Sequence, residues 1–228
     1  ISFPRDLYVK VPGVDKKEKI NSVYAYGEEK RYGSGGMVYS REAISRLSGL
    51  YIDHTVVANF QAFLEIVDII GRVTVYLDRP FVEEKQFEKE IIINLPEGEN
   101  ILDGRTALYY VRSRYSTSDF DRARRQQQVL LAIKEKVLSL GVLSNPVKIF
   151  NILDSLGRNV RTDMGRDEIL GLLENKNDYD SKNIKRKVFD NSASGLLYSS
   201  TLEDGAYILL PVGDDFKQIQ EACRNIFQ

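Results

Sequence analysis

The sequence predicts an α/β fold, and three observations indicate it. A β-branched run at residues 51–60 is followed by apolar residues at helical spacing over 60–71 and by an alternating strand pattern at 73–77. A long amphipathic helix pattern begins at Asp119. Two β-rich runs and a terminal helix pattern occupy residues 188–227. Such alternation of strands and helices along the chain is typical of α/β proteins.

Composition narrows the class of protein. The 228 residues include 32 Lys and Arg against 33 Asp and Glu, a net charge of −1, so no overall positive field attracts nucleic acid or an anionic membrane. With 43% hydrophobic residues the chain can bury a substantial core, and we predict a single domain over residues 1–228. The one cysteine, Cys223, excludes an internal disulfide. No apolar run approaches the roughly 18 to 20 residues of a membrane-spanning helix.

The first third of the chain begins with a strand pattern. Residues 1–13, ISFPRDLYVKVPG, predict a strand that enters a turn, and because no start methionine precedes it, we expect an upstream part of the domain to be missing. The charged, glycine-rich residues 28–36 predict a mobile loop. A helix follows, with Ser40 as its N-cap and Gly49 after its last turn. Residues 51–60 then predict a buried strand.

The middle of the chain carries the clearest helix signals. Apolar residues share one face of the helix that is predicted before Gly71; they are Phe63, Ile66, Val67 and Ile70. A short strand, a turn and a short helix capped by Asp103 are predicted next, although the pattern of residues 107–112 also fits an extended conformation. The helix that starts at Asp119 is expected to end at Gly141. Its predicted inward residues are Val129, Leu130, Ile133, Val137 and Leu138.

The last third is predicted to alternate in the same way. Two helices, a solvated loop, two strands and a terminal helix are expected over residues 147–156, 166–173, 175–187, 188–200, 206–212 and 214–227. The single histidine, His54, lies in the predicted buried strand and is expected to pack in the core. Without histidine or cysteine partners it cannot form a zinc site. Cys223 is expected to be buried and inert.

Positive charge is concentrated in one segment. The stretch YYVRSRYSTSDFDRARRQQQ holds five arginines in a chain that is otherwise close to neutral. Helical spacing places Asp119, Arg122 and Gln126 on one face, at the positive end of the helix dipole. Backbone N–H groups and guanidinium groups together suit a phosphate or pyrophosphate. If the preceding segment is extended, Arg112 and Arg114 point to the same side.

A structural role for the same charges stays open. Arginines at the start of a helix are often solvated, and Arg105, Arg124 and Arg125 fit that description. Arg112 and Arg114 lie beside three tyrosines, where a charge usually has a partner. That partner is either an internal carboxylate of the DFD sequence or one bound anion. The glycines of GSGG lack the spacing of a phosphate-binding P-loop.

The motifs around these arginines resemble those of the LytR-CpsA-Psr family, bacterial enzymes that attach glycopolymers to peptidoglycan. The run YVRSRY followed by DFDRARRQQQ carries the resemblance most strongly. Other stretches agree in order and spacing, namely SFPRDLYVKVPG, KINSVYAYG, IDHTVVANFQAFLEIVDIIGRVTV, LPEGENILDGRTALYYVR and VRTDM. The resemblance is strongest over residues 1–165.

The resemblance implies a three-layer α/β/α sandwich with a central mixed β-sheet and an apolar tunnel for a polyprenyl chain between sheet and helices. It implies an enzyme that transfers a glycosyl-phosphate of a wall or capsule glycopolymer from a polyprenyl-pyrophosphate carrier to a peptidoglycan hydroxyl, with pyrophosphatase side activity. Fixed guanidinium groups would stabilise the negative charge that develops as the pyrophosphate is cleaved. The enzyme would work on the extracellular face of the bacterial cytoplasmic membrane, held by an N-terminal anchor outside this chain.

Site residues follow from the resemblance by motif position. Arg112 and Arg114 match the family's paired arginines and are expected to hold phosphate oxygens. Arg122 matches an arginine on one face of the helix that follows. Asp119 either accepts the proton of the acceptor hydroxyl or orients an arginine. The second role fits better, because a carboxylate between arginines is a weak base. These four are the predicted catalytic residues. The residues predicted to bind the pyrophosphate are Arg5, Lys19, Arg125 and Gln126.

Magnesium (Mg2+) is the cofactor that the resemblance implies. Family members carry the aspartates that hold it upstream of the PRD strand, so we expect the metal ligands to lie before Ile1 and none within this chain. Transfer would be poor without them, because the metal neutralises charge on the leaving group. A second hypothesis is therefore a non-catalytic module that binds polyprenyl phosphate or a wall polyanion. Nucleic-acid binding is disfavoured by the near-zero net charge and the absence of Trp.

Overall fold

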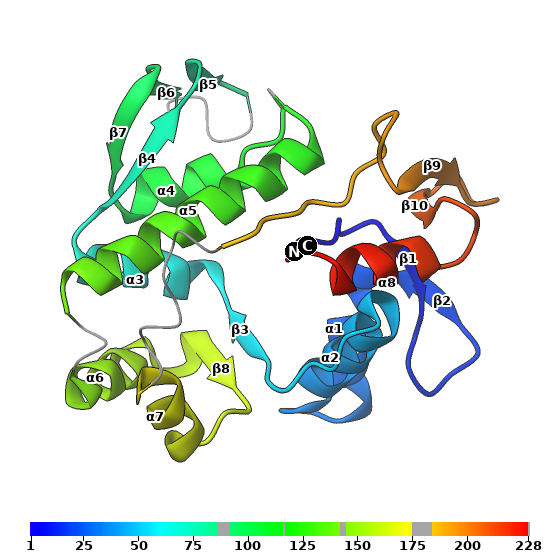
Figure 1. Ribbon diagram of the computed structural model, residues 1–228, viewed down its shortest axis with the longest axis horizontal. Coiled ribbons are helices and arrows are strands. Elements are labelled where there is room, and N and C mark those ends of the chain that lie inside the picture. Colours follow the sequence, from blue (N-terminus) through cyan, green and yellow to red (C-terminus); the bar gives the residue numbers. More distant parts are fainter. Residues whose placement is uncertain (86–91, 116, 142–144, 175–183, 228) are drawn as a thin grey trace. The chain divides into compact units, whose positions relative to one another are not determined.

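The computed structural model describes the chain in two compact units (Figure 1). The described residues are 1–85, 92–115, 117–141, 145–174 and 184–227. Unit 1 comprises residues 1–56 and 185–228, and unit 2 comprises residues 57–184. Helices and strands alternate along both units, so the predicted α/β class is confirmed. The single domain over residues 1–228 stays a prediction.

Unit 1 contains two antiparallel strand pairs. They are β1 (Tyr8–Lys10) with β2 (Lys17–Lys19) and β9 (Leu197–Thr201) with β10 (Tyr207–Pro211). A parallel bridge connects Leu7 to Leu209, and the N–H of Leu209 donates to the carbonyl of Asp6 at 2.9 Å. The beginning of the chain is therefore fixed against β10, which the distance between them in the sequence does not reveal.

Three helices complete unit 1. They are α1 (Ile20–Lys30), α2 (Gly35–Ser48) and α8 (Lys217–Arg224). The backbones of α1 and α2 approach so closely that a Cβ on Gly27 would lie 2.4 Å from the carbonyl oxygen of Gly35. Glycine is therefore required by the packing of the two helices. Ile219 and Cys223 of α8 are buried, as predicted for the cysteine, and burial raises the pKa of the Cys223 thiol.

The mobile loop predicted over residues 28–36 is wrong. The end of α1 and the start of α2 take up most of it, and Ser40 lies inside α2 rather than at its N-cap. The Glu28 carboxylate accepts the N–H groups of Gly33 and Gly36 at 2.9 and 3.0 Å, which satisfies donors of the turn and of the first turn of α2. The glycines that indicated flexibility instead allow two helices to touch.

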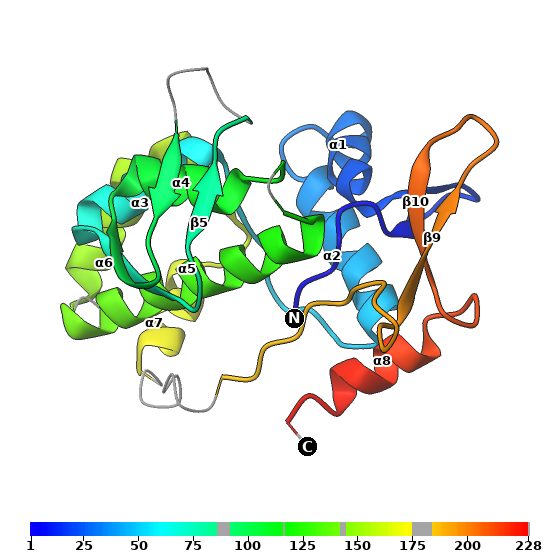
Figure 2. The ribbon, with the colours of Figure 1, turned by 90° about the horizontal axis from the view of Figure 1, so that it is seen from above.

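Unit 2 is built from three packed helices and two antiparallel strand pairs. The helices are α3 (Phe60–Ile70), α4 (Gly104–Arg112) and α5 (Asp119–Ser139), and the strands are β4 (Val73–Leu77) with β7 (Gly98–Leu102) and β5 (Phe81–Glu83) with β6 (Ile93–Leu95). The long helix α5 runs beside α3 and α4 in both views (Figures 1 and 2). The core between these elements includes Val67, Ile70, Val73, Val75, Leu102, Ala107, Val111 and Val129.

The remaining elements of unit 2 lie at its other end. They are α6 (Pro146–Leu156), a 3₁₀ turn (Gly157–Asn159), β8 (Val160–Thr162), which pairs with β3 (Val56–Ala58), and α7 (Arg166–Glu174). The predicted helices and late strands of the last third are confirmed to within a few residues, except that the first late strand begins only at Leu197. Most of the predicted loop over 175–187 falls outside the described residues. None of the described helices is long and apolar enough to span a bilayer.

The strands pair two by two. The predicted order β3, α3, β4 is confirmed, and β4 pairs with β7 and β3 with β8. In the described residues the strands form five two-stranded sheets rather than one central mixed sheet. Hydrophobic patterning shows which side chains are buried and does not specify which strands pair, because either edge of a strand offers the same backbone groups.

Three local predictions are also corrected. The strand predicted as buried over 51–60 is only three residues long and mostly exposed, and His54 is exposed as well. Leu130 of α5 is 60% exposed although its neighbour Val129 is fully buried. A β-branched run indicates an extended backbone, whereas its burial depends on neighbours that the run does not specify. The extended alternative for residues 107–112 is excluded, since they belong to α4.

Candidate functional site

The segment with five arginines folds as helix, connector and helix. Asp103 caps α4, its carboxylate accepting the N–H of Thr106 at 2.8 Å, and Arg112 is the last residue of that helix. A capping box begins α5, in which Ser118 and Asp121 accept each other's backbone N–H groups at 3.1 and 3.2 Å. The short connector that carries Arg114 therefore runs from the end of α4 to the capping box of α5.

Asp119 lies between two of the predicted catalytic arginines. Its Oδ2 lies 3.1 Å from Nη2 of Arg122, and its Oδ1 lies 4.0 Å from Nη1 of Arg114. The Asp119 side chain is 30% exposed, so the group is open to solvent and to a ligand. We call Arg114, Asp119 and Arg122 the unit 2 cluster. With one guanidinium on each carboxylate oxygen, the geometry suits a role in orienting the arginines.

Arg112 and Gln126 lie next to this cluster in the sequence and are held differently. The guanidinium of Arg112 stacks over the ring of Phe60 at 4.5 Å, a cation–π contact with the first residue of α3. Gln126 is exposed and donates to the carbonyl of Val111 at 3.4 Å. Arg112 is thus positioned by an aromatic face.

Ser113, between the two paired arginines, is fully buried. Its hydroxyl donates to the carboxylate of Glu83, and its carbonyl accepts from Nη2 of Arg125. Glu83 is itself only 2% exposed. A buried carboxylate and a buried guanidinium therefore hold one residue of the connector from two sides. On either side of it, Arg112 is partly exposed and Arg114 is exposed.

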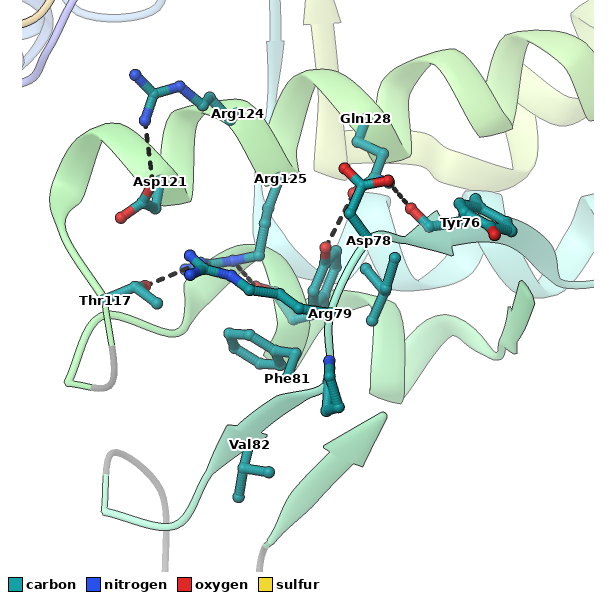
Figure 3. Close-up of a pocket in the computed structure, with 13 residues that line it drawn as sticks. Tyr76, Asp78, Arg79, Phe81, Val82, Thr117, Asp121, Arg124, Arg125 and Gln128 are labelled. Atoms are coloured by element: carbon teal, nitrogen blue, oxygen red, sulfur yellow. Dashed lines mark hydrogen bonds and ion pairs between the residues drawn. The ribbon is translucent and has the colours of Figure 1, made fainter. Parts of the chain in front are cut away.

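Arg125 has a different role from the one predicted. It is 6% exposed, and it donates from Nε to the carbonyl of Tyr110 at 2.9 Å and from Nη1 to the hydroxyl of Thr117 at 2.8 Å (Figure 3). Its guanidinium also lies over the ring of Phe81 at 4.8 Å. Burial lowers the pKa of Arg125 from its ordinary value. Because its donors serve the connector, Arg125 supports Arg112 and Arg114 instead of joining them at the surface.

Sequence reasoning missed Glu83, Ser113 and the supporting role of Arg125. One signal was available, because Glu83 ends a short strand at an inward position of the alternation. A carboxylate at a buried strand position implies a cation or a donor nearby. The arginine pattern alone did not show which guanidinium groups point inward.

Unit 1 carries the other two predicted ligands around Asp6. Nζ of Lys19 lies 2.9 Å from Oδ1 of Asp6, and Nε of Arg5 lies 3.8 Å from its Oδ2. The side chain of Asp6 is 18% exposed and those of Arg5 and Lys19 are 46% and 30% exposed. We call these three residues the unit 1 cluster. Asp6 was not predicted, although the PRD motif places it directly after Arg5.

The unit 1 and unit 2 clusters belong to separate units of the chain. That Arg5 and Lys19 meet Arg112 and Arg122 around one head group stays a prediction, and so does the apolar tunnel. The described residues include no group of three or more His, Cys, Asp or Glu that could hold a metal ion. Asp6 and Asp119 are each engaged by two cations. The described part of the chain thus does not fit a magnesium site.

Comparison with known proteins gives one family. Its sequence model, described as the LytR_cpsA_psr family, matches residues 1–225. A Bacillus subtilis protein named polyisoprenyl-teichoic acid–peptidoglycan teichoic acid transferase TagT is 32% identical over 174 residues, which are 75% of this chain and 50% of that protein. The transferase TagU of Oceanobacillus iheyensis is 34% identical over 177 residues, 77% of this chain and 51% of that protein.

Solved structures agree with the sequence comparison. The crystal structure of Bacillus subtilis TagV superimposes with a TM-score of 0.71 and 25% identity, covering 98% of this chain and 81% of that chain. The family match extends beyond residue 165, where the sequence resemblance was strongest. This chain spans about half the length of the curated relatives that it matches.

Proposed function

Since the chain belongs to the LytR-CpsA-Psr family, we propose that it transfers a glycosyl-phosphate from a polyprenyl-pyrophosphate carrier to a peptidoglycan hydroxyl. The observation that carries the proposal is the family match over residues 1–225 together with the unit 2 cluster, in which the motif arginines lie around Asp119. Two relatives of about one-third identity are named as teichoic acid transferases that act on peptidoglycan, which makes a wall polymer the expected donor.

The chemistry of the proposal is a phosphoryl transfer. The oxygen of the acceptor hydroxyl attacks the phosphorus that bears the sugar, the bond to the bridging oxygen breaks, polyprenyl phosphate leaves, and the hydroxyl proton is released to solvent. Negative charge grows on the bridging oxygen, and guanidinium groups that are already in place stabilise it without reorganising solvent. Arg112, Arg114 and Arg122 are the side chains that supply this charge in unit 2, and Arg5 and Lys19 would add to it from unit 1.

Asp119 acts in the proposal as the residue that orients Arg114 and Arg122. Both of its oxygens face guanidinium groups, at 4.0 and 3.1 Å. These residues do not provide the ligands for magnesium, and the proposed steps use only the side chains of this chain. The proposed place of action is the outer face of the cytoplasmic membrane, where the carrier and peptidoglycan meet, with a membrane anchor outside this chain.

The test is transfer by the chain itself. Incubation with a polyprenyl-pyrophosphate-linked teichoic acid precursor and a peptidoglycan acceptor should release polyprenyl phosphate and produce labelled peptidoglycan. Arg112→Ala or Arg114→Ala should lower the rate by at least about 100-fold, the loss typical of removing a group that stabilises developing charge, while the unfolding midpoint changes little. Binding of the precursor without turnover would favour the non-catalytic module instead. Unchanged rates in both variants would contradict the site.

A further inference from the structure

Unit 2 has a second concave surface, on the other side of α5 from the unit 2 cluster. A pocket of about 510 Å³ opens between the connection from β4 to β5 and α5 (Figure 3). Its lining includes Tyr76, Asp78, Arg79, Asp121, Arg124 and Gln128. The volume lies in the range of sites for small organic ligands, about 300–1,000 Å³, and exceeds what one inorganic ion fills.

Helix geometry separates this pocket from the predicted pyrophosphate site. At about 100° per residue, Asp121, Arg124 and Gln128 share one face of α5, whereas Asp119, Arg122 and Gln126 share another. The two faces point roughly 160° apart. This pocket is therefore not an extension of the unit 2 cluster. Sequence reasoning assigned Arg124 only a solvated role and assigned none to Arg79 or Gln128.

The charges on the pocket wall favour an anion. Three guanidinium groups face two carboxylates, and the pair of Arg124 and Asp121, 2.9 Å apart, is already balanced. Arg79 is exposed, and no hydrogen bond or ion pair of its side chain occurs within the described ranges. Figure 3 shows the Arg79 side chain extended across the pocket in the direction of Arg125. Like charges that face one pocket repel unless an anion joins them.

The rest of the wall offers groups that can hydrogen-bond the hydroxyls of a sugar. The carboxylate of Asp78 and the amide of Gln128 are among them. Gln128 accepts from the hydroxyl of Tyr110 at 2.9 Å and donates to the carbonyl of Tyr76 at 2.6 Å, which fixes this end of the wall. The amide of Gln128 is thus held in place before a ligand binds.

We propose that this pocket binds a sugar unit that carries an oxyanion, with Arg79 holding the anion. A phosphate on the sugar would indicate a segment of the glycopolymer, and a carboxylate would indicate the glycan of the wall. The chemistry that Arg79 recognises, a planar or tetrahedral oxyanion, is common to both.

Calorimetric titration of the chain with glucose 1-phosphate, glucuronate and glucose tests the proposal. At least one anionic sugar should bind saturably and at least about 10-fold more tightly than neutral glucose, the factor expected for one charge-assisted contact. Arg79→Gln should weaken that binding about 10-fold. The matched control is Arg105→Gln, which removes an exposed guanidinium from α4 outside the pocket and should change nothing. The tighter of the two anionic sugars identifies the source.

Other outcomes would overturn the proposal. Equal binding of glucose and the anionic sugars would show that Arg79 does not hold an anion. An unchanged affinity of Arg79→Gln for the anionic sugar would show the same. If Arg112→Gln abolished binding while Arg79→Gln did not, the ligand would occupy the predicted pyrophosphate site. The side-chain amide resonance of Gln128 gives an independent readout by NMR, since it should shift on titration. No transfer reaction is measured, so failure here leaves the proposed function untouched.

Discussion

Asp6 in unit 1 and Asp119 in unit 2 each lie between two cationic side chains, yet the surrounding protein supports the two clusters differently. In unit 2 the support comes from side chains, because the buried Glu83 and Arg125 hold Ser113 of the connector. In unit 1 the support comes from the backbone. The carbonyl of Asp6 accepts the N–H of Leu209, and those of Arg5 and Leu7 accept N–H groups at the start of α1.

The difference shows where each cluster is vulnerable. Backbone hydrogen bonds survive almost any side-chain substitution, so the unit 1 cluster depends on the packing of α1 and β10. A buried side-chain network fails when one member is removed, since the others then lose partners in a place that water does not reach. The unit 2 cluster is therefore expected to respond strongly to single substitutions that lie outside it.

The largest effect is expected at Arg125. Arg125→Met removes the donor to two buried carbonyls, which should lower the free energy of unfolding by about 3–5 kcal/mol. The matched control is Arg124→Met, the neighbouring residue, whose exposed ion pair with Asp121 contributes at most about 1 kcal/mol. Urea denaturation measures both. Equal destabilisation by the two variants would contradict the inward role of Arg125.

A smaller effect is expected from the packing that supports unit 1. Gly27→Ala places a Cβ 2.4 Å from the carbonyl oxygen of Gly35, so α1 and α2 must separate, at a cost of about 1–3 kcal/mol. Helix propensity alone predicts the opposite sign. Gly171→Ala in α7, where a Cβ meets nothing within 4 Å, should stabilise by roughly 0.5–1 kcal/mol. Thermal unfolding of the two variants should therefore shift in opposite directions, and a shared direction would contradict the close helix contact.

These two substitutions mark what the sequence could and could not predict. The helix that ends before Gly71, the cap at Asp103 and the helix from Asp119 follow from local patterns, because the signals and their effects lie within a few residues. The glycines of residues 33–36 led to the wrong prediction of a mobile loop. Gly35, together with Gly27, is required by the contact between α1 and α2, and no local rule distinguishes such a contact from flexibility.

The candidate site was predicted unevenly for the same reason. Motif positions identified Arg114, Asp119 and Arg122, and the structure brings these three together. Arg125 carries the same chemistry in the same run of residues, but its direction depends on where the connector folds back over α5. Asp6 was missed because its importance lies in two partners, one of which is thirteen residues away.

The third expected effect compares the two carboxylates directly. Asp119→Asn and Asp6→Asn each remove the charge that holds two cations, which should lower the rate of the proposed transfer about 10-fold through misplaced guanidinium groups. Stability should change by less than about 1 kcal/mol, because both ion pairs are partly exposed. Combining Asp119→Asn with Arg122→Gln should cost little more than either change alone if the two residues act as one unit. Additive losses would show that Asp119 acts independently, for example as a base.

The smallest effect concerns the cap of α4, the helix that ends at Arg112. A backbone hydrogen bond from Thr106 lowers the pKa of Asp103 below its ordinary value, so the ionised carboxylate stabilises the folded state above about pH 4. That contribution is lost as the pH falls through the folded-state pKa. Asp103→Asn keeps the hydrogen bond but not the charge, and should cost at most about 0.5 kcal/mol at pH 7 and nothing at about pH 2.5. Urea midpoints at the two pH values measure the difference, and a difference that persisted at the lower pH would show that the cap depends on shape and not on charge.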